Sequence, residues 1–327
     1  MMKRRHVITL LGGATAWPHI ASAQQPAMPV VGFLSGASPV PFAALVGAFR
    51  QGLNDSGFVE GQNVAIDYRW AEGRFDRLPQ MANEMVARRV DVLVATAGDR
   101  SAQAAKAATS TIPIVFSSGG DPVANGLVAS LGRPGGNLTG VSLFTTLLEA
   151  KRLGLLHDAV PAAATISLLV TRGSPSTPAV VRDAEDGARR AGVRLVVVQA
   201  QAKSEFDAAF ASLVQQRATA LAVGNSAFFN SQRERLVALA ARHKLPAIYE
   251  FREFTMAGGL MSYGTHLGEM YRQIGVYTGR ILKGAKPGDL PVLQPTRFEL
   301  VINLLTARAL GLTIPQALLL RADQVIQ

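Results

Sequence analysis

Short apolar runs alternate with amphipathic stretches along most of this chain. The run from Pro29 to Leu34 predicts a buried strand, and apolar residues at helical spacing from Phe42 to Leu53 predict a helix directly after it. The alternation continues with strands expected at 64–70, 91–95 and 112–116 and helices at 78–86 and 101–108. Strands that alternate with helices in this way predict a parallel sheet covered by helices on both faces.

The same pattern restarts near residue 165. Strands are expected at 165–170, 193–198, 220–223 and 246–249, with helices at 178–191, 204–216 and 230–243. Two such sets of similar size predict an α/β fold with two doubly wound, Rossmann-like lobes. We expect residues 28–141 and 263–293 to form the first lobe, and 142–262 and 294–327 the second. The chain is expected to cross between the lobes at 138–142, 258–264 and 294–299, where glycines can absorb hinge rotation.

The N-terminus has the order of an export signal. It consists of the basic residues Lys3, Arg4 and Arg5, an apolar stretch from Val7 to Ala16, and the small residues Ala21, Ser22 and Ala23 before Gln24. The apolar part is too short to span a bilayer of about 30 Å as a helix. We therefore expect residues 1–23 to be cleaved, and the adjacent arginines favour the twin-arginine route. A basic N-terminus without function is the alternative.

Composition excludes several kinds of site. The chain has 327 residues and no cysteine, which excludes disulfides, thiolate metal sites and a cysteine nucleophile. Its formal net charge is +10, or about +7 without the signal, but the cations are scattered along expected helix faces. This spread is typical of a solvated surface, so we expect no nucleic-acid partner. No later segment has the uncharged apolar length of a membrane helix.

Catalytic motifs are missing from the sequence. The histidines after the signal are His157, His243 and His266, and no two of them have metal-ligand spacing. There is no G-x-S-x-G elbow and no G-x-x-x-x-G-K-[ST] phosphate loop. We therefore expect no catalytic residues, no metal and no cofactor.

Small and polar residues follow the expected strands. Ligands of open parallel sheets bind beyond the C-terminal strand ends, and the loops there are 35–38, 96–101, 117–121, 171–174, 225–228 and 249–252. Their helix N-termini can present N–H groups to a carboxylate or phosphate, and Asp121 and Glu250 can receive an ammonium group. Trp70 and Tyr263 can sandwich a flat apolar group. Turn chemistry, helix capping and core packing are the alternatives for each residue, but six loops facing one cleft favour a ligand site.

Several sequence blocks carry a family resemblance. They are Val31–Leu34 with Phe49–Leu53, Phe58–Val64 (FVEGQNV), Ile112–Phe116 leading to Asp121-Pro122-Val123, Arg133–Val141 (RPGGNLTGV), Leu245–Tyr249, Gly258–Gly264 (GGLMSYG) and Ile281–Gly284. Over nearly all of the chain after the signal, the sequence resembles ABC-transporter solute-binding proteins of the type I periplasmic-binding fold. It is most similar to the family whose better-known members bind tryptophan, phenylalanine or tyrosine.

The resemblance implies a function and a set of contacts. It implies a periplasmic monomer that captures a small amino-acid-like or aromatic solute and delivers it to an inner-membrane permease, without enzyme activity. The implied ligand contacts are Ser35, Gly98, Asp99, Ser101, Asp121, Ser142, Ser174, Asn225 and Glu250. Relatives often have small residues after Gly98, whereas this chain has Asp99-Arg100, which can form a salt bridge or contact an anionic ligand. A sensory module of the same fold and an exported enzyme are the alternative functions.

Overall fold

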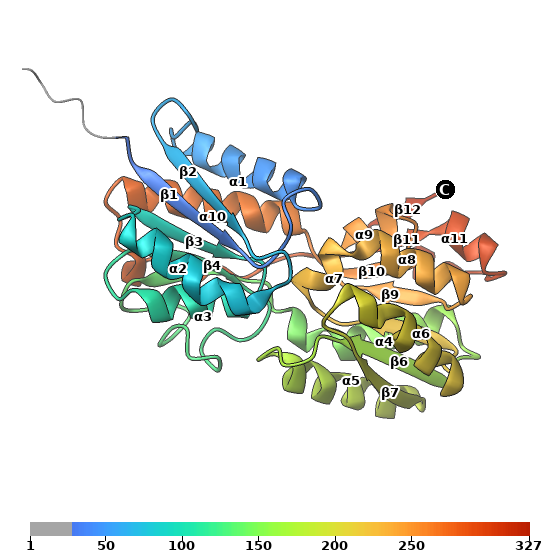
Figure 1. Cartoon of the computed structure of the whole chain (residues 1–327). Coiled ribbons are helices and arrows are strands. Elements are labelled where there is room, and N and C mark those ends of the chain that lie inside the picture. The colour runs from blue at the N-terminus through green and yellow to red at the C-terminus, as the bar shows by residue number, and fades with distance from the viewer. Residues whose placement is uncertain (1–27) are drawn as a thin grey trace, which may run out of the picture.

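A computed structural model describes residues 28–327, which form two α/β lobes side by side (Figure 1). The first lobe has a five-stranded parallel sheet in the order β2-β1-β3-β4-β5. Its strands are β1 (Val30–Ser35), β2 (Ala65–Trp70), β3 (Val92–Thr96), β4 (Ile114–Ser118) and β5 (Leu138–Ser142). Its helices are α1 (Ala43–Asp55), α2 (Leu78–Ala87), α3 (Asp99–Ala108) and α10 (Leu267–Leu282), with 3-10 turns η1 (Phe75–Arg77) and η4 (Pro287–Asp289). The expected export signal lies outside the described residues.

Helices cover both faces of the first sheet, as the alternating pattern predicts. Phe33 of β1 packs into a core with α1 and α10, and the next residue, Leu34, packs into a second core with α2 and α3. Glycines allow α1 and α10 to approach closely. A Cβ at Gly52 would lie 1.9 Å from the Arg272 carbonyl oxygen, so this contact requires glycine.

The second lobe has a seven-stranded sheet in the order β12-β11-β10-β9-β8-β6-β7. Its strands are β6 (Thr165–Val170), β7 (Arg194–Gln199), β8 (Ala220–Val223), β9 (Ala247–Tyr249), β10 (Met261–Thr265), β11 (Phe298–Asn303) and β12 (Gln324–Ile326). Its helices are α4 (Glu149–Ala159), α5 (Thr177–Ala191), α6 (Phe206–Gln215), α7 (Ala227–Ser231), α8 (Arg233–Arg242), α9 (Arg252–Met256), α11 (Leu304–Ala309) and α12 (Gln316–Leu319). Two 3-10 turns, η2 (Thr145–Leu147) and η3 (Lys203–Glu205), complete it.

One strand pair departs from the expected parallel arrangement. β10 and β11 are antiparallel, with Tyr263 opposite Leu300. β10 leads out of the second lobe toward α10, and β11 begins where the chain returns from the first lobe. The end of β10 and the start of β11 therefore lie at the same edge of the second sheet, the edge that faces the first lobe. Two neighbouring strands connected in this way run in opposite directions.

The chain passes between the sheets slightly later than expected. Residues 138–142 form β5 of the first sheet, so the first crossing follows Ser142. The boundary expected between 262 and 263 falls inside β10, which continues in the second sheet to Thr265. Leu293 forms an isolated β-bridge with Val141 of the first sheet. The third crossing therefore lies between Leu293 and β11 and overlaps the expected segment 294–299.

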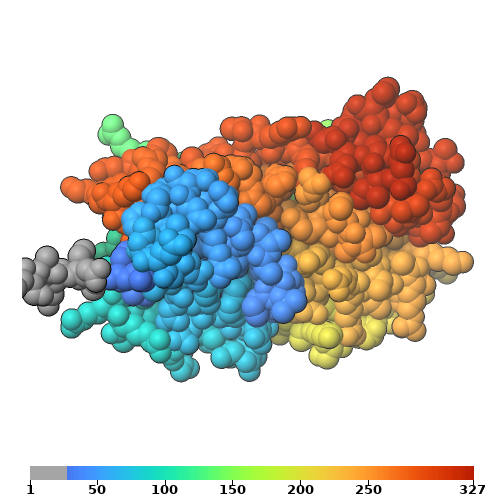
Figure 2. All heavy atoms as spheres, turned by 90° about the horizontal axis from the view of Figure 1, so that it is seen from above, coloured from blue at the N-terminus to red at the C-terminus, as the bar shows by residue number. Residues whose placement is uncertain are grey.

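Contacts between the lobes extend beyond these crossings. Seen from above, the blue N-terminal part of the first lobe meets the yellow and orange part of the second (Figure 2). There Arg233 Nη1 donates a hydrogen bond of 3.1 Å to the Pro41 carbonyl. Across the described residues, no helix combines the length and apolar character needed to cross a membrane.

Candidate ligand-binding site between the lobes

A small cavity lies between the lobes, at the C-terminal ends of β3, β4, β6 and β8. Its volume is ≈ 50 Å³, and a second cavity of ≈ 30 Å³ adjoins it and shares Ala97, Gly98, Gly119, Asn225 and Ala227. Ligand pockets are typically about 300–1,000 Å³ in volume. The lobes are therefore closed on each other, and a solute can enter only when they move apart.

Asp99 joins the lobes at the polar end of the cavity. Its carboxylate accepts hydrogen bonds from Ser118 Oγ (2.6 Å), the Gly119 amide (3.1 Å) and Asn125 Nδ2 (3.2 Å), all from the first lobe. It also accepts one from Ser176 Oγ of the second lobe. Four donors around one buried carboxylate occupy its acceptor sites, so Asp99 holds the closed lobes together.

Arg100, the next residue, faces the same cavity. Its Nη2 donates to the Arg172 carbonyl (3.3 Å) and to the Gly173 carbonyl, both in the second lobe. The guanidinium lies 4.8 Å from the centre of the Phe75 ring, within the range of a cation–π contact. Partial burial lowers the pKa of Arg100 from its ordinary value, but an arginine of this kind stays protonated.

The backbone before α3 is strained where it meets the cavity. Ala97 has φ +61° and Gly98 has φ +113°, and positive φ is costly for alanine. This turn brings the N-terminus of α3, with Asp99 and Arg100, against the second lobe. Opposite it lies Thr171, which is 4% exposed and whose Oγ1 has no hydrogen-bond partner in the structure.

The adjoining cavity has an apolar wall. Its large side chains are Phe42, Leu143, Phe251, Leu267 and Tyr271. Phe42 directly precedes α1, Leu143 lies in the first crossing and Phe251 lies in the loop after β9. Leu267 and Tyr271 belong to α10. Asn230 also lines this cavity, and its Oδ1 is buried without a hydrogen-bond partner. The combined site therefore has a polar end and an apolar end.

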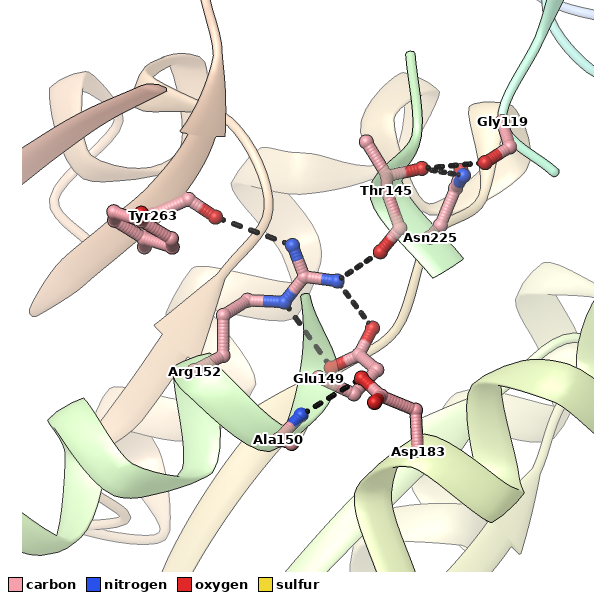
Figure 3. Close-up of polar contacts among 8 residues, drawn as sticks. All are labelled: Gly119, Thr145, Glu149, Ala150, Arg152, Asp183, Asn225 and Tyr263. Carbon is pink, nitrogen blue, oxygen red and sulfur yellow. Dashed lines mark hydrogen bonds and ion pairs between the residues drawn. The ribbon is translucent and has the colours of Figure 1, made fainter. Parts of the chain in front are cut away.

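A buried charge network is centred on Arg152 and Glu149 (Figure 3). Arg152 donates from Nε to Glu149 (3.1 Å), from Nη1 to the Tyr263 carbonyl (3.1 Å) and from Nη2 to the Thr145 carbonyl (2.9 Å). This guanidinium thus ties α4 to β10 and to η2. Because η2 follows the first crossing and β10 precedes the second, the network fixes the second-lobe ends of two crossings.

Thr145 connects that network to the cavity. Its amide and its Oγ1 both donate to the Gly119 carbonyl of the first lobe, at 3.2 and 3.1 Å. Asn225 Nδ2 donates to the same Oγ1, which places the amide of Asn225 on the cavity wall (Figure 3).

Glu250 is buried near this network. Burial raises its pKa to about 8, although Arg152 and a hydrogen bond with Thr145 favour the charged form; Glu149 and Glu253 raise it further. Its Oε1 has no hydrogen-bond partner. The side chain is therefore largely neutral at neutral pH, which differs from the ammonium-binding carboxylate expected from the sequence.

Four of the residues expected to contact a ligand line the cavity: Gly98, Asp99, Ser174 and Asn225. The others, Ser35, Ser101, Asp121, Ser142, Glu250, Trp70 and Tyr263, are not among its lining residues.

Apart from Glu250, whose surroundings are given above, these residues are found in the following environments. Ser35 Oγ accepts from the Ala37 amide, and Ser142 Oγ donates to the Gly120 carbonyl. Ser101 is fully buried in α3. Asp121 is exposed, and its Oδ1 accepts from the amides of Val123 (2.8 Å) and Ala124 (3.3 Å), so it caps its own turn. Trp70 packs on Phe33 and Tyr68, and the Tyr263 ring stacks on Phe298.

Sequence reasoning missed most of the apolar wall and part of the polar end. Thr171 and Asn225 were within the expected loops, but Ser176, Phe42 and Tyr271 were not. Phe42 and Tyr271 have the helical spacing of core residues, and no local signal distinguishes a core residue from one at the edge of a cleft. Phe75 precedes α2 in a short 3-10 turn that the apolar pattern does not mark.

Comparisons with known proteins agree with this architecture. The model of a family described as ABC transporter substrate binding protein matches residues 29–326. A tyrosine-binding protein from Clostridioides difficile (strain R20291) is 29% identical over 264 residues, which are 81% of this chain and 75% of that protein. The structure of a conserved domain protein from Vibrio cholerae has a TM-score of 0.84 at 28% identity, covering 91% of this chain and 99% of the other.

Two further structures bear on the arrangement of the lobes. A domain from Streptococcus pneumoniae in complex with L-Trp and a ligand-free, open substrate-binding protein from Clostridium difficile are each 26% identical and cover 91% of this chain and 99% of theirs. The TM-scores are 0.83 for the complex and 0.64 for the open structure. The lobes here are therefore arranged more like those of the complex, in agreement with the hydrogen bonds across the cleft.

Proposed function

Because this chain belongs to the ABC transporter substrate-binding protein family, we propose that it captures a small aromatic or amino-acid-like solute between its lobes. The bound solute is then delivered to a membrane permease. Proteins of this family work outside the cytoplasm, bind a small molecule and serve an ABC transporter. Capture and delivery of the solute involve no catalytic step by this chain.

The observation that carries the proposal is the composition of the interlobe cavity. One end is polar, with Asp99, Arg100 and Thr171, and the other is apolar, with Phe251 and Tyr271. A solute with a polar head and a flat apolar body matches both ends. The tyrosine-binding relative and the tryptophan complex support an aromatic body.

Capture proceeds by hinge closure in this proposal. The lobes, taken as residues 28–142 with 266–293 and 143–265 with 294–327, rotate about the three crossings. The bonds from Ser176 to Asp99 and from Arg100 to the Gly173 carbonyl break on opening and form again around the solute.

A ligand screen tests the proposal. The chain from Gln24 onward is titrated with L-tyrosine, L-tryptophan, L-phenylalanine, their deaminated acids and neutral sugars, by thermal shift and calorimetry. A solute at about 100 times its dissociation constant adds about 2.7 kcal/mol of stability. We expect an aromatic solute to bind and the sugars not to bind. Binding of sugars alone would overturn the proposed class.

Two matched variants locate the binding site. Ala227 lines both parts of the cavity, so Ala227→Phe fills the space and should abolish binding. Ala208 is exposed on α6, so Ala208→Phe is the control and should retain full affinity. Equal affinity in both variants would place the solute elsewhere.

We also propose periplasmic export as a monomer through the twin-arginine route. The adjacent Arg4 and Arg5 before the apolar stretch support this. Replacing both with lysine should block export, and sequencing of exported protein should begin at or near Gln24. Unimpaired export of the double variant would favour the general secretory route. Light scattering of the exported protein measures its oligomeric state.

A further inference from the structure

The two charged side chains of the interlobe cavity differ in how fully the protein satisfies their hydrogen-bonding groups. One acidic residue, Asp99, and one basic residue, Arg100, line the cavity. Asp99 accepts four hydrogen bonds from the protein itself, including one from Ser176. Arg100 has no carboxylate partner among the described residues and donates to backbone carbonyls of the second lobe. The cavity thus contains a guanidinium that forms no ion pair within residues 28–327, whereas the acceptor sites of Asp99 are occupied.

The position of Arg100 suits a ligand carboxylate. Its guanidinium is held against the Phe75 ring, which fixes its plane at the cavity. Nη2 makes the recorded bonds, and the remaining N–H groups are available to a bidentate anion. When the lobes separate, the carbonyls of Arg172 and Gly173 move away from it, because they belong to the second lobe.

Thr171 supplies an independent observation at the same place. Thr171 lines the cavity and is almost fully buried, and its hydroxyl has no hydrogen-bond partner. Buried hydroxyls usually have partners, so one without a partner in a cavity wall marks a position for a ligand atom. A carboxylate between Arg100 and Thr171 would satisfy both groups from opposite lobes.

In the described part of the chain, no carboxylate in the cavity has a free acceptor for an ammonium group. The four hydrogen bonds to Asp99 leave it no free acceptor. Asp121 caps an exposed turn, and Glu250 lies outside the cavity lining with a pKa raised to about 8. Burying an unpaired ammonium carries a large desolvation cost. At this site, the carboxylate of a zwitterionic amino acid would therefore bind favourably and its ammonium group would bind unfavourably.

We propose that the solute of this protein is an aromatic or similarly apolar carboxylate without an ammonium group beside the carboxylate. Its carboxylate binds Arg100 and Thr171, and its apolar body lies against Phe251 and Tyr271. This inference rests on the proposed function and narrows its ligand class.

Matched ligand pairs test the inference. Calorimetry compares L-phenylalanine with 3-phenylpropanoate, L-tyrosine with 3-(4-hydroxyphenyl)propanoate, and L-tryptophan with indole-3-propanoate. Each pair differs by the ammonium group alone. We expect at least one of the deaminated acids to bind at least about tenfold more tightly than its amino acid. Phenethylamine, which keeps the ammonium and lacks the carboxylate, should not bind.

Variants of Arg100 assign the contact. Arg100→Gln should weaken binding of the preferred acid at least about tenfold, and Arg100→Lys should restore part of the affinity, since lysine keeps the charge without the planar fork. Arg190→Gln, at an exposed position on α5, is the control and should bind as the unaltered protein does. Circular dichroism confirms that each variant is folded.

The outcomes separate this inference from the proposed function. If the amino acids bind as tightly as the acids or more tightly, this inference is wrong and the proposed function stands. If no aromatic compound of either series binds, both are overturned. If the acids are preferred but Arg100→Gln retains full affinity, the assignment of Arg100 is wrong.

Discussion

Arg152 and Glu149 form an ion pair that is fully removed from solvent. Arg152 Nη2 lies 2.5 Å from Glu149 Oε1, and both side chains have 0% exposure. The same guanidinium donates to carbonyls at two crossings between the lobes. The charges therefore act together with the backbone of the hinge.

Breaking this pair should destabilise the protein strongly. Arg152→Met leaves Glu149 charged and buried, which typically costs about 3–5 kcal/mol. The double variant Glu149→Leu with Arg152→Met removes both charges and should recover part of that loss. Urea unfolding measures the free energy of unfolding of the unaltered protein, the single variant and the double variant. Asp186→Ala, which breaks an exposed pair with Arg189, is the control and should cost under about 1 kcal/mol. A similarly small loss in Arg152→Met would contradict the prediction.

Asp121 should matter for stability and not for affinity. Its carboxylate caps the turn at Val123 and Ala124 and does not line the cavity. Asp121→Ala should therefore lower the free energy of unfolding by about 0.5–2 kcal/mol. The dissociation constant of any solute found in the screen should stay within about twofold of its original value. A tenfold loss of affinity in calorimetry would return Asp121 to the binding site.

Glu250 should make the protein less stable as pH rises. Its pKa is raised by burial from 4.5 to about 8, so the folded state binds its proton more tightly than the unfolded state. The stability linked to this proton is fully present below about pH 4.5 and is lost as the pH rises through about 8. Glu250→Gln should remove that pH dependence. The free energy of unfolding of the variant, minus that of the unaltered protein, should therefore be more than ~2 kcal/mol higher at pH 9 than at pH 4.5.

Chemical unfolding at a series of pH values measures this difference. Glu185→Gln, at an exposed position on α5, is the control and should follow the unaltered protein. Parallel curves for Glu250→Gln and the unaltered protein would show that Glu250 ionises normally.

Ser176 should influence how far the free protein opens. Its hydroxyl donates to Asp99 across the cleft, and Asp99 keeps three other donors without it. A hydrogen bond to a charged group contributes about 1.5–3 kcal/mol, so Ser176→Ala should shift the equilibrium toward open lobes roughly tenfold or more. Small-angle scattering should show a larger radius of gyration without ligand. Ser174→Ala, which removes a cavity hydroxyl with no recorded hydrogen bond across the lobes, should show no such increase.

Asn230 should select solutes with a hydrogen-bond donor on the ring. Asn230 lines the apolar cavity, and its Oδ1 is buried without a hydrogen-bond partner. An unsatisfied buried acceptor costs about 1–3 kcal/mol. Asn230→Leu should therefore reduce the preference for 3-(4-hydroxyphenyl)propanoate over 3-phenylpropanoate by about tenfold or more. Calorimetry of both acids gives the ratio. An unchanged ratio would mean that the ring end does not reach Asn230.

The sequence by itself determined most of the local elements within residues 29–116 and 165–249, and the place of the cleft. The apolar run before Ser35 and the helical spacing after Phe42 correspond to β1 and α1. Loops expected at the ends of β3, β4, β6 and β8 do line the interlobe cavity. These features depend on neighbours in the chain, because burial of one face imposes a period of two or 3.6 residues.

Helix α4 shows where this reasoning failed. The apolar pattern predicts no helix at Glu149–Ala159, although α4 lies there and packs against α5. Its inward side includes Glu149 and Arg152, both of which are buried. A periodic pattern treats charged residues as facing solvent. Burial of Glu149 and Arg152 becomes tolerable only when the folded chain brings them together with the carbonyl groups that Arg152 binds.

The tertiary structure alone decided which side chains reach the cavity. Asp99 and Asp121 both follow strands and precede helical turns, yet Asp99 lies between the lobes and Asp121 faces solvent. Tyr271 enters the site from α10, far along the chain from Asp99, after the second crossing returns to the first lobe. The three crossings bring these segments together, and the hydrogen bonds across the closed cleft select the residues that line it. Both are long-range effects that have no counterpart in a local pattern of residues.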